Sequence, residues 1–450
     1  MKFAARVLTA ALFLYSFAAS VRAQTTKLSA RHISLSEAVQ LALKHNHVVR
    51  IAGFQVQEKQ DAKELARSGY FPNLTNESRI FTVTDTQFID IPAGGLGTVA
   101  GTPVPAKSAI LNQGGKTFVI SGTTLSQPLT QLLTRVKPAN EIASADLTAT
   151  RANEQNTVNE IALQVHQIYY QILVTQLHKS AAEAKIRAAQ DQESERVAQV
   201  KYGSALDTEL IDSQAQTLET KQDLLTTELQ LSDLTMQLND VMGLPVATQL
   251  ELDPTVPDVQ ESCQREECVK MALASHPEII EARAEVEKAS AAVRLAKADY
   301  FPDVSAFARY DYQSDVPFLA RNFGSFGAQM TYDLFDGGRR RAALGESGAT
   351  LAQARENLAR VTDEVERSVE TAANRLERTR EMVNVSEQIL TLRAESSRIS
   401  AQELERGEAL RSQADAALAQ EFDAKTMLLR SQLDYTQAHD ELLQAMGQTP

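Results

Sequence analysis

Histidine, cysteine and closely spaced acids, the residues that most often do chemistry in proteins, are few and dispersed in this chain. Its seven histidines fall in no ligand spacing such as H-E-x-x-H, and no serine or cysteine stands in a nucleophile motif. The acids recur instead at helical intervals, which is typical of solvated helix faces. We therefore expect no enzyme activity and no cofactor.

The two cysteines, Cys263 and Cys268, lie five residues apart in "CQREEC". In an oxidising compartment such a pair forms a disulfide, but on one helix the two side chains would diverge. The spacing therefore leaves a disulfide and two free thiols both open. A zinc site needs about four ligands, and none of the others is nearby, so we expect no metal.

The first 23 residues have the layout of a secretory signal peptide. Lys2 and Arg6 precede an apolar run of about 14 residues, and small residues lead to Ala23. A retained N-terminal anchor is the alternative, although the run is short for a membrane helix. No later stretch approaches about 18 apolar residues, so any membrane-spanning segment is expected to be a β-strand.

The formal net charge is -13, and removal of three cationic residues with the signal peptide leaves -16. Nucleic-acid affinity comes largely from Lys and Arg on phosphates, so we expect no nucleic-acid partner. In an assembly of several chains this charge multiplies, which favours a cation preference if the acids line a lumen.

The chain is an internal duplication. Residues 37–72 align without a gap on 267–302 at an offset of 230, and both segments end in Tyr-Phe-Pro. Further on, 203–243 aligns on 407–447 at an offset of 204, so the first copy carries 26 extra residues. The Gly- and Pro-rich segment at 88–116 accommodates them and is expected to be a long loop. We assign 24–250 to the first repeat and 251–450 to the second.

Each copy is predicted to contain a helix, two strands and a long helical hairpin. Pro72 and Pro302 end the first helices, because proline disfavours helical backbone at the preceding residue. Alternating residues then predict strands at about 72–86, 117–130, 302–313 and 323–335. Such alternation is typical of a transmembrane barrel with an apolar outer face, or of a half-buried hairpin in a soluble domain.

The hairpin helices are exceptionally long. They are expected at about 137–201 and 205–242 in the first copy, and from about 342 to 404 and on to about 445 in the second. Apolar residues three, four or seven apart predict coiled-coil packing along their whole length. Four strands from one chain fall short of the roughly eight that a barrel needs, so a spanning barrel requires several chains.

The order of signal peptide, duplicated helix–Tyr-Phe-Pro–strand–loop–strand–hairpin units, and "G-x-A-L" hairpin tips resembles the TolC-like outer-membrane efflux proteins (outer membrane factors). The resemblance implies a mixed α and β fold in which a trimer builds a 12-stranded outer-membrane β-barrel continuous with a 12-helix periplasmic α-barrel. It also implies passive export through a tripartite efflux pump or type I secretion system. The implied partners are a periplasmic adaptor (membrane fusion protein), an inner-membrane pump of the RND, ABC or MFS type, and outer-membrane lipid.

The resemblance places a candidate gate at the hairpin tips. Gly203, Glu209 and Asp212 of the first tip fit the family pattern, whereas the same steps from Gly407 reach Gln413 and Ala416, which are not acids. Residues near the second tip that offer charge instead are Glu405, Glu408, Arg411 and Asp415. Their usual alternative role is that of a solvated helix face.

The aromatic residues of the repeated tripeptide, Tyr70, Phe71, Tyr300 and Phe301, suit the headgroup boundary of a membrane. The leading hypothesis is thus an outer-membrane exit duct of a Gram-negative-type cell with a large periplasmic part. The alternative is a periplasmic coiled-coil scaffold or adaptor without a membrane barrel.

Overall fold

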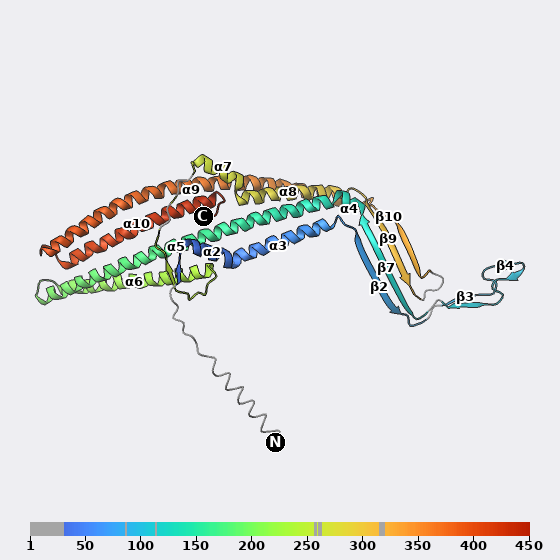
Figure 1. Ribbon diagram of the computed structural model, residues 1–450, viewed down its shortest axis with the longest axis horizontal. Coiled ribbons are helices and arrows are strands. Elements are labelled where there is room, and N and C mark those ends of the chain that lie inside the picture. The colour runs from blue at the N-terminus through green and yellow to red at the C-terminus, as the bar shows by residue number, and fades with distance from the viewer. Residues whose placement is uncertain (1–30, 86–87, 113–114, 256–258, 260–262, 315–319) are drawn as a thin grey trace, which may run out of the picture.

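The computed structural model describes residues 31–85, 88–112, 115–255, 259, 263–314 and 320–450, and the predicted signal peptide lies outside them. The molecule is elongated, with long helices at one end and an antiparallel sheet at the other (Figure 1). The helices are α2 (Leu35–His45), α3 (His47–Ser68), α4 (Leu129–Thr134), α5 (Val136–Lys201), α6 (Asp207–Val241), α7 (Arg265–Ser275), α8 (Pro277–Ala298), α9 (Arg339–Glu405) and α10 (Arg411–Ala445). None of these helices is long and apolar enough to cross a membrane.

The strands form one large sheet and several small ones. They are β1 (Arg31–Ile33), β2 (Asn73–Thr82), β3 (Phe88–Ile91), β4 (Thr98–Val99), β5 (Thr102–Pro103), β6 (Ala109–Asn112), β7 (Thr117–Pro128), β8 (Leu250–Leu252), β9 (Asp303–Gln313) and β10 (Asn322–Thr331). The large sheet has the order β10-β9-β7-β2, with every neighbouring pair antiparallel. The hairpin of the first copy therefore lies beside the hairpin of the second.

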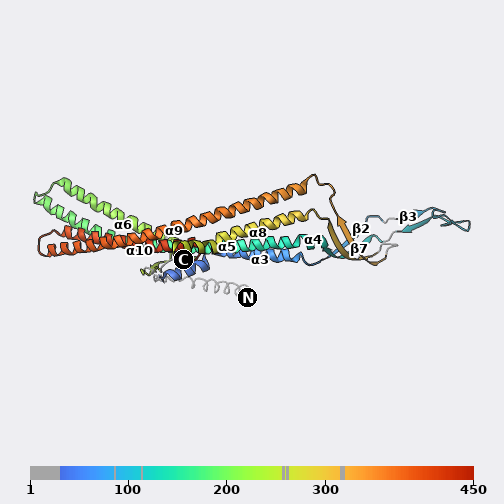
Figure 2. The same cartoon turned by 90° about the horizontal axis from the view of Figure 1, so that it is seen from above.

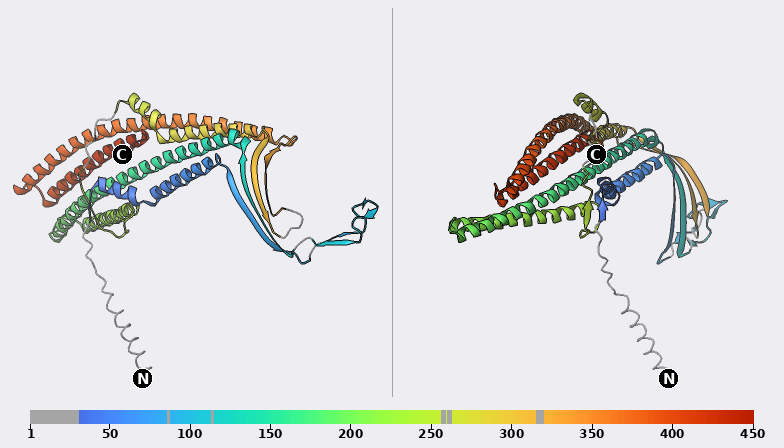
Figure 3. Two further views of the ribbon diagram at one scale, coloured as in Figure 1. Left: turned by 45° about the vertical axis from the view of Figure 1, so that its right-hand side comes forward. Right: turned by 60° about the vertical axis from the view of Figure 1, so that its left-hand side comes forward.

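The helices form a single layer, and different helices lie side by side near the sheet and far from it. Near the sheet, α5 packs against α3 on one side and α8 on the other, and α8 packs against α9. Farther from the sheet, α5 packs against α6 and α10, and α10 packs against α9. Figures 2 and 3 show this layer continuing from one end of the helical part to the other.

The duplication is visible in the element bounds. Helices α2 and α3 recur as α7 and α8 after 230 residues, and α6 recurs as α10 after 204. One expectation was wrong: the single helix predicted ahead of the strands in each copy is two helices, and in the second copy the break falls at His276. The residue before Pro277 is extended there (φ -60°, ψ 129°), and Nδ1 of His276 accepts a hydrogen bond from the Glu278 amide at 3.3 Å. In the first copy, Asn46 makes the same break without a proline.

The segment 88–116 is also not an unpaired loop. Strand β3 pairs with β6, and β4 pairs with β5, so its described residues form a ladder beyond the large sheet (Figure 1). Gly94, Gly97 and Gly101 adopt positive φ in its turns, where glycine carries no Cβ penalty. Two strands of the large sheet end earlier than expected, β2 at Thr82 and β10 at Thr331, which lie opposite the first residues of their partner strands β7 and β9.

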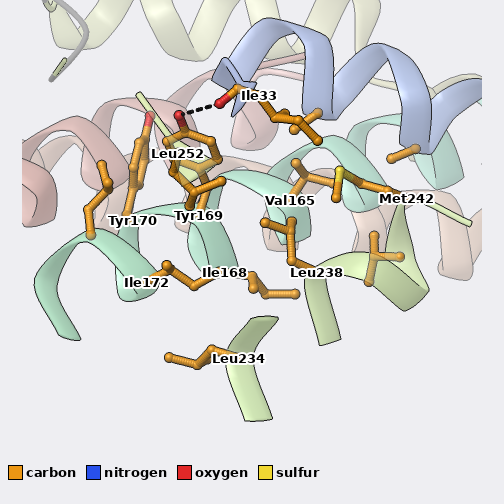
Figure 4. Close-up of a cluster of buried hydrophobic side chains, with 14 of the residues drawn as sticks. Ile33, Val165, Ile168, Tyr169, Tyr170, Ile172, Leu234, Leu238, Met242 and Leu252 are labelled. Carbon is orange, nitrogen blue, oxygen red and sulfur yellow. Dashed lines mark hydrogen bonds between the residues drawn. The ribbon is translucent and has the colours of Figure 1, made fainter. Parts of the chain in front are cut away.

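The first copy has its core where α5 crosses α6 and the short parallel sheet β1–β8 (Figure 4). Tyr169 is almost fully buried, and its hydroxyl donates to the carbonyl oxygens of Ile33 at 3.2 Å and Asp253 at 3.0 Å. Burial raises the pKa of Tyr169 to about 12, so the hydroxyl stays a donor at neutral pH. This side chain fixes both strand ends to the middle of α5.

We predict that Tyr169→Phe lowers the free energy of unfolding by about 1–3 kcal/mol, because the Asp253 carbonyl oxygen loses its donor and the Ile33 carbonyl oxygen keeps only its bond from the Asp253 amide. Urea unfolding in detergent, followed by circular dichroism, measures it. Tyr202→Phe is the control, since Tyr202 is 82% exposed at a hairpin tip. Equal midpoints for the two variants would contradict the assignment.

Candidate functional site: the hairpin tips and the seam between α5 and α10

Both helical hairpins turn through a left-handed glycine. Gly203 has φ 73° and Gly407 has φ 74°, a conformation that L side chains rarely adopt. After each glycine, one amide reaches back over the last helical turn: Ser204 N–H donates to the Gln199 carbonyl and Glu408 N–H to the Glu403 carbonyl, both at 2.8 Å. The two tips are therefore equivalent tight turns at the same end of the molecule (Figure 1).

Helices α5 and α10 carry the polar contacts between the first hairpin and the second. We call this contact the α5–α10 seam. On α5 it comprises His166, Tyr170, Lys185, Asp191 and Glu195, and on α10 it comprises Arg411, Ser412, Asp415, Asp423 and Asp440. Any movement of one hairpin away from the other must break these contacts.

The part of the seam nearer the sheet is buried. Asp440 is 5% exposed, and its Oδ2 lies 2.6 Å from Nδ1 of His166 and 3.1 Å from the hydroxyl of Tyr170, which donates to it. Burial alone would raise the pKa of Asp440, but the hydrogen bond with His166 and the nearby imidazole of His439 outweigh it and lower the pKa. Burial and the neighbouring carboxylate raise the pKa of Tyr170. This end holds a fixed charge that is costly to separate from its partners.

The part nearer the tips is half-exposed and acidic. Ser412 donates to Glu195 through its amide at 3.1 Å and through its hydroxyl at 2.5 Å. Arg411 Nε lies 3.4 Å from Asp191 and 3.7 Å from Asp415. Burial raises the pKa of Asp415, the facing carboxyl of Asp191 raises it further, and Arg411 acts against both. Protonation of Asp415 therefore favours the contact between α5 and α10 near the tips.

The predicted tip residues divide between the seam and the solvent. Arg411 and Asp415 lie together on the seam, whereas Glu405, Glu408 and Asp212 are exposed. Glu209 accepts from Arg196 at 2.9 Å within its own hairpin. The structure thus does not bring the predicted acids of the first tip, Glu209 and Asp212, together with those of the second within one chain.

The other predicted residues lie away from the tips. Tyr70, Phe71, Tyr300 and Phe301 are 43–68% exposed where the helices meet the sheet, and Arg340 lies 5.8 Å from the ring centroid of Tyr300. Cys263 and Cys268 are paired as a disulfide at the start of α7, with Cα atoms 5.5 Å apart. Cys263 precedes the helix, so the two side chains do not diverge as they would within one.

Sequence reasoning missed the buried residues of the seam. His166 stands inside the apolar stripe Val165–Ile168–Ile172, and Asp440 stands between Ala438 and Leu442. A charged or titratable residue inside an apolar stripe was the available signal, since such groups are buried only with a partner. The identity of that partner, more than 270 residues away, was not in the pattern.

Three solved outer-membrane proteins have the same fold over 92% of this chain. They are the Campylobacter jejuni CmeC outer membrane channel (13% identity, 85% of that chain, TM-score 0.75), VceC of Vibrio cholerae (15%, 96%, 0.72) and the open state of the Neisseria gonorrhoeae MtrE outer membrane channel (16%, 89%, 0.70). The fold is thus that of outer-membrane channel proteins.

The sequence of the second repeat adds a match to a family model. Residues 268–448 match the model of outer membrane efflux proteins, so the resemblance to the TolC-like efflux proteins is confirmed. That family consists of channels and not of enzymes. Among curated proteins, none matches this sequence.

We predict that the tip half of the seam tightens in acid. Because the pKa of Asp415 is raised in the assembled seam, its contribution is fully present below the ordinary carboxyl pKa and is lost as pH rises through the raised value. Spin labels at Tyr202→Cys and Arg406→Cys, one on each tip, should report a longer distance at higher pH. The native cysteines are already paired.

The variant Asp415→Asn keeps the neutral form and should make that distance independent of pH. Glu209→Gln is the control, because Glu209 bridges within one hairpin and its loss leaves the pH response intact. A pH response that survives in Asp415→Asn would overturn the assignment.

Proposed function

We propose that three copies of this chain form an exit duct through the outer membrane of a Gram-negative-type cell. In this proposal, the signal peptide ends at Ala23, and the repeats 24–250 and 251–450 each supply two barrel strands and a helical hairpin. The four-stranded sheets join into a 12-stranded barrel, and the helical layers join into a 12-helix periplasmic tube. The family resemblance and the free edges of both layers support it.

The observation that carries the proposal is that the two outer strands of the sheet are connected directly to the two outer helices of the layer. In the described sheet, β2 and β10 are the outer strands, each paired on one side. The chain runs from α3 into β2 and from β10 into α9, which are the outer helices of the layer. Unpaired strand edges are not tolerated in a bilayer, and head-to-tail closure of several copies removes all of them.

Apolar stripes on the outer helices fit the same closure. Along α6, Ile211, Leu218 and Leu225 are 56–66% exposed at intervals of seven residues. Along α9, Leu392 and Ile399 are 72% and 43% exposed at the same interval, following Val385. A seven-residue apolar repeat is the pattern of a coiled-coil seam, so α6 of one copy has a matching surface on α9 of the next.

The charges of the sheet support a barrel with a polar interior. The registers place all charged residues of β2, β7, β9 and β10 on one face; they are Glu77, Arg79, Asp303, Arg309 and Asp311. The other face carries residues such as Ala308, Tyr310 and Phe326. A charged side chain facing lipid at mid-membrane costs about 2–4 kcal/mol, so the charged face belongs inside.

The tips of the hairpins are proposed to control the periplasmic entrance, where the α5–α10 seam holds the two hairpins together. The proposed partners are a periplasmic adaptor and an inner-membrane pump, which supply the energy and the selection of cargo. Residues Tyr70, Phe71, Tyr300 and Phe301 are proposed to lie at the periplasmic boundary of the lipid, where amphipathic rings are stable.

Planar-bilayer recording tests the function directly. We expect purified protein to run as a detergent-resistant trimer from the outer-membrane fraction and to open ion-conducting pores. A soluble periplasmic monomer without conductance would overturn the duct and favour a coiled-coil scaffold.

We predict that Leu218→Glu and Leu392→Glu each weaken the trimer, because each puts a charge into the proposed contact between neighbouring copies. Light scattering after size-exclusion chromatography in detergent measures the loss. Gln216→Glu is the matched control, since it adds the same charge about 200° around α6. An unchanged trimer in both leucine variants would contradict this interface.

A further inference from the structure

Four of the five charged residues of the sheet lie in one compact row that crosses from the first copy to the second. Glu77 on β2 faces Gly122 on β7, and Gly122 faces Asp311 on β9. Arg79 pairs with Glu77, and Arg309 pairs with Asp311. We call Glu77, Arg79, Arg309 and Asp311 the charge row.

Gly122 leaves the space that the row requires. A Cβ at this position would lie 2.8 Å from Nη2 of Arg309 and 2.9 Å from Oδ1 of Asp311, closer than real Cβ contacts. Nε of Arg309 donates to both carboxylate oxygens of Asp311, at 2.8 and 2.9 Å. The guanidinium of the second copy therefore lies across the backbone of the first, held by its own strand's carboxylate.

The side chains of Arg309 and Asp311 differ in their exposure to solvent. The side chain of Asp311 is only 11% exposed, whereas that of Arg309 is 46% exposed. The Glu77 and Arg79 side chains are 66% and 69% exposed. The row has no net charge. Its exposed surface nevertheless carries more positive than negative charge, since the carboxylate of Asp311 lies beneath the guanidinium of Arg309.

The row matters because a barrel of this size is narrow. Twelve strands about 4.8 Å apart and tilted about 40° enclose a radius of about 12 Å, measured to the backbone. Side chains reduce it further, and the Debye length is about 8 Å at physiological ionic strength. Ions in such a barrel pass within the range of the row, and rings of charged side chains set the selectivity of pores.

We propose that the charge row determines ion selectivity in the barrel, and that Arg309, held across Gly122 by Asp311, opposes the cation preference of an otherwise acidic chain. The inference rests on the proposed duct, in which this face of the sheet lines the lumen. It assigns the discrimination between cationic and anionic cargo in the barrel to residues far from the hairpin tips.

The test is the reversal potential of single channels in a KCl gradient. Arg309→Gln should raise the permeability of K⁺ relative to Cl⁻ by roughly twofold or more. In this variant Asp311 loses its partner in each of the three copies, so three unneutralised carboxylates remain near the ion path. Asp311→Asn should shift the ratio toward Cl⁻. Gly122→Val should displace the guanidinium and change the ratio without changing any charge.

Two controls separate local charge from damage to the pore. The double variant Arg309→Gln/Asp311→Asn restores neutrality and should return the ratio toward that of the wild type. Arg355→Gln removes the same charge from an exposed position on α9 and should leave the ratio nearly unchanged. Each variant is first checked for its trimer by size-exclusion chromatography.

The failures are distinguishable. Conducting trimers whose permeability ratio is the same in Arg309→Gln, Asp311→Asn and the wild type would overturn the role of the row and leave the duct standing. A wild-type protein that forms neither trimers nor pores would overturn the duct, and this inference with it.

Discussion

The structure depends on the packing of other helices along the whole length of α5. At about 1.5 Å per residue, the 66 residues of α5 extend for about 99 Å, and a helix of that length buries nothing by itself. It is covered by changing partners, α3 and α8 near the sheet and α6 and α10 toward the tips. The change of partners takes place where β1 and β8 pair and where Tyr169 ties both strands to α5. This belt is accordingly the most densely buried part of the first copy.

The seam follows from the same constraint, because α5 belongs to the first copy and its neighbour α10 to the second. The seam is not uniform along its length. At the belt, the buried carboxylate of Asp440 has partners that it cannot lose without a large desolvation cost. Toward the tips, Lys185–Asp423 and Arg411–Asp191 are partly exposed pairs, which contribute little each. Separation of the hairpins is therefore easiest at the tips and is resisted at Asp440.

Much of this architecture could be predicted from the sequence, because the duplication repeats local signals. Proline after Tyr-Phe placed the helix-to-strand junctions, and glycine placed both hairpin turns. The ladder of 88–112 was not predicted, since its strands are two to four residues long and lie among glycines and prolines. The seam was not predicted either: periodicity places His166 on a buried face but does not indicate that Asp440 lies opposite. The repeated sequence signals predict the structure within each copy, but they do not predict the contacts between the two copies.

The charge row shows how two copies of one unit acquire a shared site. Arg79 and Arg309 are equivalent, 230 residues apart, but their acidic partners are not. Glu77 precedes its arginine by two residues, whereas Asp311 follows by two, and the equivalent positions are Phe307 and Phe81. In a strand, a step of two keeps the side chain on the same face, so both acids stay on the charged side of the sheet. The opposite steps bring both acids to the level of Gly122, one on each flanking strand. Divergence at only two pairs of positions thus converts a repeated arginine into a single row that neither copy contains alone.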